Sequence, residues 1–252
     1  MRALFNLTVA VASAALVSAA IAAAAVPAYI ATAVASHDRP AADTARDAGR
    51  KPAEVIAFSG MKRGSVVGDL IPGGGYYDRI FAGVVGPKGH VYGFYPAELH
   101  NFIKQPLPAD GATPDPKFPV FTALVAPVND FAAPKPLDIV WISDNYHDLH
   151  DPFFAPADVA KINAAVFKAL KPGGIYLVLD HVAEPGSGLR DTNTRHRIDE
   201  TVVKTEVEAA GFKLVGESEV LKNPADTHMD NVFVPAIRGH TDQFILKFRK
   251  PG

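Results

Sequence analysis

Histidine and carboxylate residues, which often carry acid–base and metal chemistry, gather at three places in this sequence. Each group lies next to an apolar run, where a strand or helix is expected to begin or end. The groups are Asp144-Asn145-Tyr146-His147-Asp148-Leu149-His150-Asp151, Asp180-His181 and Arg195-His196. Because parallel strands point their carboxyl ends at one edge of a sheet, we expect His147, His150 and His181 to converge.

Proton removal is the chemistry that these residues suggest first. Histidine titrates near neutral pH and can act as a general base toward a hydroxyl or an amine. His147 is the first candidate because it follows a strand tip directly, and His181 is the second. Asp144 and Tyr146 complete the candidate catalytic group. The simpler interpretation is that these residues only cap loops and helix ends.

Two other chemistries have weaker support. His147, His150, His181 and nearby carboxylates are suitable metal ligands, but a His-x-x-His pair in a loop is a weak signal. The chain has no cysteine and no His-Glu-x-x-His helix, so we expect no metal. A serine hydrolase needs Gly-x-Ser-x-Gly after a strand, and Gly186-Ser187-Gly188 lacks that spacing.

A glycine-rich turn is the feature around which the rest of the chain is arranged. An apolar run from Val66 ends at Asp69, and Gly73-Gly74-Gly75 precedes an amphipathic segment, 77–85. This order predicts a strand, a tight loop and a helix. Glycines allow positive φ and close approach of backbone N–H groups to a ligand near a helix N-terminus. The alternative is an ordinary glycine-rich turn.

Strand and helix patterns alternate along the chain, which predicts a doubly wound α/β layer with a mostly parallel sheet. After the run at Val66, strands are expected at 90–95, 119–126, 137–143, 175–182, 212–219 and 242–249. Helices are expected at 52–60, 77–85, 97–103, 156–170 and 194–210, the last ended by Gly211.

Four pieces of the sequence occur in the order found in class I S-adenosylmethionine-dependent methyltransferases, and residues 52 to 250 resemble that family. The pieces are the turn 69–75, the strand with a polar tip 137–144, Leu170-Lys171-Pro172-Gly173-Gly174 and Glu208-Ala209-Ala210-Gly211-Phe212. More narrowly, the chain resembles predicted exported bacterial methyltransferases of unestablished substrate, through segments 72–77, 223–227 and 246–251. The resemblance implies a seven-stranded sheet of order 3-2-1-4-5-7-6 with the final strand antiparallel.

The resemblance also implies S-adenosylmethionine as cofactor and a set of residues that would bind it. Asp69 would hold the loop or the amino-acid end of the cofactor, and the glycines would let its methionine part approach. Asn129 and Asp130 would flank the adenine, and Asp144 would lie beside the methyl-transfer position. The implied cofactor-binding set is Asp69, Gly73, Gly74, Gly75, Tyr95, Asn129, Asp130 and Asp144.

The sequence departs from the family at two positions. Ile71-Pro72 replaces the first loop glycine, which stiffens the turn and removes a backbone donor. Tyr95 stands where the family has an acid that accepts hydrogen bonds from both ribose hydroxyls, and a tyrosine offers a single hydroxyl. Glu98, three residues later, is the alternative acid.

The N-terminal 35 residues resemble an export signal. Arg2 precedes a long Ala-, Val-, Leu- and Ile-rich run, and Ala-x-Ala patterns end at Ala33 and Ala35. We expect either a cleaved signal or a retained membrane anchor, and in both cases a domain outside the cytoplasm. Residues 36–51 are expected to form a linker, and 52–252 a methyltransferase-like domain.

Composition places further limits on function. The 252-residue chain is 48% hydrophobic and has a formal net charge of −2, so its composition does not indicate binding to nucleic acid. We expect a methyltransferase that acts on an unidentified small molecule, without a membrane partner unless the N-terminal segment is retained. The alternative is an exported, non-catalytic ligand-binding protein with the same fold. The sequence does not indicate an oligomeric state.

Overall fold

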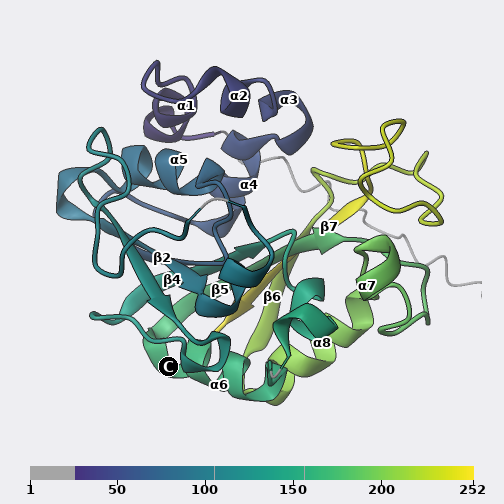
Figure 1. The fold of residues 1–252 in the computed structure, drawn as a ribbon. Coiled ribbons are helices and arrows are strands. Elements are labelled where there is room, and N and C mark those ends of the chain that lie inside the picture. The colour runs from purple at the N-terminus through teal and green to yellow at the C-terminus, as the bar shows by residue number, and fades with distance from the viewer. Residues whose placement is uncertain (1–25, 105, 156) are drawn as a thin grey trace, which may run out of the picture.

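A seven-stranded sheet forms the centre of the molecule (Figure 1). The computed structural model describes residues 26–252 except 105 and 156. The strand order is β3-β2-β1-β4-β5-β7-β6, and β7 runs antiparallel to both neighbours. This confirms the expected doubly wound fold and strand order. The strands are β1 (Val66–Leu70), β2 (His90–Pro96), β3 (Phe121–Ala126), β4 (Leu137–Ser143), β5 (Leu170–His181), β6 (Lys213–Ser218) and β7 (Gln243–Arg249).

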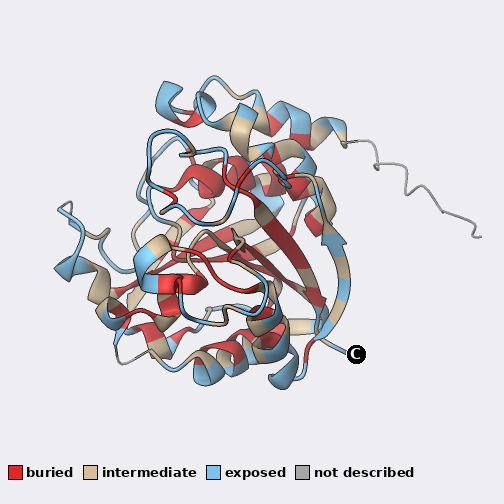
Figure 2. Cartoon of the chain, turned by 90° about the vertical axis from the view of Figure 1, so that its right-hand side faces the viewer, coloured by how far each residue is buried: buried red, intermediate tan, exposed pale blue. Residues whose placement is uncertain are grey.

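Helices cover both faces of the sheet, and each face has its own apolar core (Figure 1). On one face α1 (Ala28–Val34), α4 (Pro52–Ser59) and α5 (Tyr76–Val85) pack over a core that includes Trp141. On the other, α6 (Val159–Ala169) and α8 (Glu200–Ala209) cover a core that includes Phe212. Figure 2 shows the strands mostly buried, with exposed residues on loops and outer helix faces.

Short helices complete the fold and lie mainly in the connections between strands. They are α2 (Ala41–Thr44), α3 (Asp47–Arg50), α7 (Thr192–Arg195) and the 3-10 helices η1 (Gly86–Lys88), η2 (Ala97–Asn101), η3 (Val128–Asp130), η4 (His147–His150) and η5 (Pro152–Phe154). The helix expected at 97–103 is therefore a shorter 3-10 helix. Within the described part of the chain, no helix combines the length and apolarity needed to cross a bilayer.

The N-terminal region is more ordered than its composition indicated. Residues 1–25 of the expected export segment lie outside the described residues, whereas α1 packs on α5 and buries Ile30 and Ala33. Gly83 permits this approach, since a Cβ added there would lie 2.9 Å from the Ala33 Cβ. The expected linker, 36–51, forms α2 and α3, because Asp43 and Asp47 find arginine partners rather than solvent.

The expected long helix 194–210 was wrong. His196 adopts a left-handed conformation with φ 56°, which ends α7 after one turn. Asp199 then caps α8, its side chain accepting a hydrogen bond from the Thr201 backbone N–H. A parallel bridge between Val182 and Ile198 joins the intervening segment to the end of β5. This break places His196 beside η4, a position that an unbroken helix could not give it.

Candidate functional site

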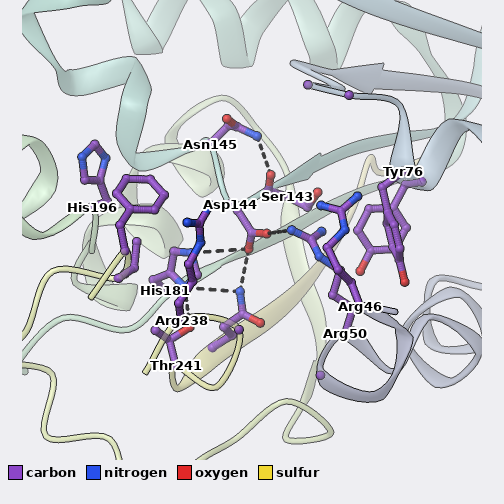
Figure 3. Close-up of a pocket in the computed structure, with 18 of the residues that line it drawn as sticks. Arg46, Arg50, Tyr76, Ser143, Asp144, Asn145, His181, His196, Arg238 and Thr241 are labelled. Carbon is purple, nitrogen blue, oxygen red and sulfur yellow. Dashed lines mark hydrogen bonds and ion pairs between the residues drawn. The ribbon is translucent and has the colours of Figure 1, made fainter. Parts of the chain in front are cut away.

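One cavity of about 740 Å³ opens at the carboxyl edge of β1, β4 and β5 (Figure 3). The glycine-rich loop after β1 forms one wall, and the residues that follow β4 and β5 form another. Two further segments complete it: residues 45–50 around α3 and residues 232–243 before and at the start of β7. The cavity therefore lies where open α/β sheets bind ligands.

The glycine-rich loop keeps its tight shape despite the replacement of its first glycine. Ile71 has a φ of 62°, a left-handed conformation that is strained for a β-branched side chain. Gly73 and Gly74 line the cavity, and a Cβ added at either would meet nothing within 4 Å. Gly75 instead caps the N-terminus of α5 with φ 75°. The loop thus leaves open space where a ligand can approach its backbone.

Asp144 is the charged residue at the tip of β4, and it also has a positive φ, of 58°. One carboxylate oxygen accepts a hydrogen bond from Arg50 at 2.9 Å, and the other from the Gln243 amide at 2.6 Å. The Oδ1 atom of Asp144 lies 3.9 Å from the Nε2 atom of His181 (Figure 3). Asp144 therefore joins three segments that lie far apart in the sequence.

The residues around α3 bring positive charge to the cavity. Arg46 and Arg50 stack their guanidinium groups over the Tyr76 ring, at 4.7 and 4.9 Å from its centroid. The Tyr76 hydroxyl donates to Asp47 at 2.6 Å, which fixes α3 against the start of α5. Sequence reasoning missed these arginines because they belong to the segment expected to be a linker.

His147 is buried in the cavity wall and held by two carboxylates. Its Nδ1 lies 2.8 Å from Asp180 Oδ1, and its Nε2 lies 3.2 Å from Asp148 Oδ1. Burial opposes a charge on this imidazole, but Asp180 and Asp148 outweigh it and raise the pKa of His147 well above its ordinary value. In this arrangement the ring holds its proton at neutral pH and is a poor general base.

His181 differs from His147, although their ring centroids are 6.2 Å apart. Its Nδ1 lies 2.8 Å from the Thr241 hydroxyl oxygen. Burial lowers the pKa of His181, although Asp144 and Asp180 act in the opposite direction. The neutral ring at the cavity wall is therefore the better proton acceptor of the two.

Two expected catalytic neighbours lie elsewhere. Tyr146 is fully buried, and its hydroxyl donates to Glu206 at 3.0 Å while accepting from Asn163 at 2.8 Å. His150 also contacts Glu206, at 3.2 Å. Tyr146 thus belongs to the core beneath α6 and α8, and the half-buried His150 turns toward α8. Neither side chain lines the cavity, so the expected catalytic position of Tyr146 and the convergence of His150 were wrong.

Asp69, an expected cofactor ligand, lies in the core outside the cavity wall. It is 2% exposed and lies beside the carboxyl of Asp78, which is fully buried on α5. Burial and the second carboxyl raise the pKa of Asp69 well above its ordinary value. Two adjacent buried carboxyls hold a proton between them. Asp69 therefore fastens α5 to β1.

The residues expected to contact ribose and adenine also lie outside the cavity wall. Tyr95 is buried in the core near Asp69, and Asn129 accepts a hydrogen bond from the Asp158 backbone N–H at the start of α6. Asp130 is exposed and forms a 3.4 Å ion pair with Lys161. These side chains serve as core and helix-end residues in this arrangement.

A long loop before β7 forms the rim of the cavity opposite the glycine-rich loop. It is anchored by a buried ion pair in which Arg197 contacts both oxygens of Asp226, at 2.9 and 3.1 Å. Asp226 also accepts from the Asp242 backbone N–H at 2.7 Å. The side of the cavity formed by this loop includes Phe233, Arg238 and Thr241. The sequence did not identify these residues as part of a site, because their polarity does not distinguish them from other loop residues.

Comparisons with known proteins confirm the fold. No family profile matches the chain, and no curated protein is similar to it in sequence. A S-adenosylmethionine-dependent methyltransferase from Aquifex aeolicus is 17% identical, with a TM-score of 0.51 over 80% of this chain and 88% of that one. An arsenic(III) S-adenosylmethionine methyltransferase from Chlamydomonas reinhardtii is 18% identical, with a TM-score of 0.51 over 90% and 75%. The glycopeptide N-methyltransferase MtfA, solved with S-adenosylmethionine, is 16% identical, with a TM-score of 0.50 over 79% and 86%.

Proposed function

We propose that this protein is an S-adenosylmethionine-dependent methyltransferase that acts on a small-molecule acceptor. The observation that carries the proposal is one cavity that joins the open glycine-rich loop to Asp144 and His181. The activities named for proteins of similar structure support it. The cavity volume, about 740 Å³, lies within the range of small-molecule sites.

The residues of the cavity fit the methionine end of the cofactor. Gly73 and Gly74 leave room for its backbone, Arg50 can pair with its carboxylate, and Asp144 can pair with its ammonium group. The nucleoside would be held by different residues from those of the family, since Tyr95 and Asp130 lie outside the cavity wall.

In this proposal, different residues of the cavity wall have different roles in methyl transfer. When bound, the cofactor would supply a methyl group on a sulfonium, and transfer of that group to a nucleophilic oxygen or nitrogen would leave the sulfur as a neutral thioether. His181 takes the proton of the acceptor hydroxyl or amine at Nδ1, the nitrogen to which the Gln243 amide donates at 3.3 Å and beside which the Thr241 hydroxyl lies at 2.8 Å. Without a bound metal ion, His147 keeps its own proton and leaves proton acceptance to His181. The loop at 232–241 covers the acceptor and limits access of water.

Binding to the purified full-length chain tests the proposal. We expect S-adenosylmethionine to give saturable heat in calorimetry. Gly74→Leu should weaken binding by about 5- to 150-fold, because a side chain forced into a filled site costs about 1–3 kcal/mol. The fold should persist, since nothing lies within 4 Å of the added Cβ.

Asp130→Asn is the matched control, because it alters a residue that the family resemblance assigns to the adenine but that lies outside this cavity wall. Its affinity should equal that of the unaltered chain. Loss of affinity in Asp130→Asn with none in Gly74→Leu would place the cofactor elsewhere. No binding at millimolar concentration would reject the activity.

A ligand-binding protein is the second candidate, because the cavity wall carries three arginines, Arg46, Arg50 and Arg238. Such a wall favours an anionic small molecule. Thermal-shift measurements with dicarboxylates and phosphate monoesters, beside S-adenosylmethionine, distinguish the two. A shift with the anions alone would favour binding without methyl transfer.

We also propose that the protein acts outside the cytoplasm, in the bacterial periplasm, on the composition of residues 1–35. Ile30 and Ala33 are core residues, so processing N-terminal to Ala28 would preserve the fold, whereas cleavage after Ala35 would remove α1. Cell fractionation followed by N-terminal sequencing of the recovered protein tests both points. A mature chain that begins at Ser36 would contradict the retention of α1.

A further inference from the structure

We propose that His147, Asp148 and His196 form a binding site for a divalent metal ion, with Zn²⁺ as the best fit to their geometry. These residues lie in the wall of the cavity and come from η4 and from the residue that follows α7. The site does not depend on methyl transfer, since it rests on the arrangement of the three side chains alone.

The three ligand atoms form a compact triangle. His147 Nε2 lies 3.2 Å from Asp148 Oδ1 and 3.3 Å from His196 Nδ1, and the latter two atoms are 3.7 Å apart. A tetrahedral zinc ion with bonds of about 2.0–2.1 Å separates its ligand atoms by about 3.3–3.4 Å. An octahedral ion at about 2.1 Å would bring them to about 3.0 Å. The triangle is therefore close to the tetrahedral spacing.

The second nitrogen of His147 has the partner that metal-bound histidines usually have. Asp180 accepts a hydrogen bond from the His147 backbone N–H at 2.9 Å, and its other oxygen lies 2.8 Å from Nδ1. A carboxylate at Nδ1 selects the tautomer in which Nε2 presents its lone pair and increases the basicity of that nitrogen. The ring orientation is thus fixed before any ion binds.

His196 is placed at this site by an unusual backbone. Its φ of 56° separates α7 from α8 and lets its ring lie 5.4 Å from that of His147. The Phe233 ring also packs against His196, at 4.8 Å between ring centroids. A left-handed conformation is strained for a residue other than glycine. Metal binding would offset that strain.

The proposed ligand set leaves a coordination position for a ligand in the cavity. Two histidines and one carboxylate with an open fourth position are the arrangement of catalytic zinc sites. An oxygen ligand, such as a hydroxyl or a carboxylate, would complete the coordination. The sequence offered His147, His150, His181 and nearby carboxylates as ligands, and the weakness of that pattern led us to expect no metal. Of those three histidines, the structure places His147 in the present group, whereas the loop after β4 turns His150 toward α8.

Zinc titration of the full-length chain, stripped with a chelator, tests the site. We expect calorimetry to show one Zn²⁺ per chain. Asp180→Asn should weaken binding by about 10- to 100-fold, the usual effect of losing an outer partner. His196→Ala and the isosteric Asp148→Asn should weaken it more. His240→Ala, which alters an exposed histidine of the same cavity, is the matched control and should bind as the unaltered chain does.

The outcomes separate a metal site from a hydrogen-bonded cluster. Circular dichroism shows which variants remain folded, and Asp148→Asn keeps the test valid if His196→Ala does not fold. Absence of stoichiometric binding to the unaltered chain would overturn the proposal and leave the three side chains as a hydrogen-bonded cluster. Equal binding by Asp148→Asn and the unaltered chain, or equal weakening by His240→Ala, would also overturn the proposal.

Discussion

Replacement of Asp78 by asparagine is expected to remove a large part of the pH dependence of stability. Asp78 is fully buried on α5, and its carboxyl lies beside that of Asp69 on β1. Burial raises the pKa of Asp78 from 3.8 to about 7. An asparagine keeps the shape of this side chain but has no carboxyl proton, so the variant removes one member of the pair that shares the proton.

The sign and size of the effect follow from proton linkage. Below pH 3.8 the Asp78 carboxyl is protonated in both the folded and unfolded states, so it does not oppose folding. Between pH 3.8 and about 7 the folded state keeps a proton that the unfolded state has released, and the free energy of unfolding falls by about 1.4 kcal/mol per pH unit. The loss amounts to about 4 kcal/mol and is complete above pH 7.

Urea unfolding from pH 4 to pH 8 measures this effect. The stability of Asp78→Asn minus that of the unaltered chain should rise by up to about 4 kcal/mol across this range, or about 8–16 °C in Tm for a domain of this size. Asp130→Asn, at an exposed ion pair, should run parallel to the unaltered chain. Parallel curves for Asp78→Asn as well would refute a buried, protonated carboxyl pair.

Two further substitutions test how the site is supported. Ile30→Ala should lower the free energy of unfolding by about 2–5 kcal/mol, because Ile30 is a fully buried residue of α1. The exposed Thr32→Ala, also on α1, should change it by less than about 0.5 kcal/mol. Equal effects of the two variants in urea unfolding would contradict a packed α1. Arg197→Ala should lower the free energy of unfolding by about 3–5 kcal/mol, because it leaves Asp226 buried without its cation. Lys222→Ala, at an exposed ion pair, is its control. A small loss for Arg197→Ala in thermal unfolding would mean that another contact anchors the loop before β7.

The elements of the sheet could be predicted because their signals are local. The strands expected at 90–95 and 137–143 match β2 and β4 to within a residue, since each is an apolar run bounded by turn residues. The helix at 52–60 ends as expected at Gly60, which has a φ of 81°. Periodicity failed at 194–210, because a left-handed residue in mid-pattern has no apolar signature.

The sequence by itself determined the fold class, the strand order through its family resemblance, and the presence of His147, His181 and Asp144 at strand tips. Tertiary structure decided what these residues contact. Burial and neighbouring charge come from segments distant in the chain, so no local pattern showed that Arg50 reaches Asp144 or that His196 lies against His147. Burial and a neighbouring charge also explain why Asp69, an expected cofactor ligand, is a core residue. Its carboxyl lies beside the buried carboxyl of Asp78, so the pair holds a proton, and Asp69 does not line the cavity.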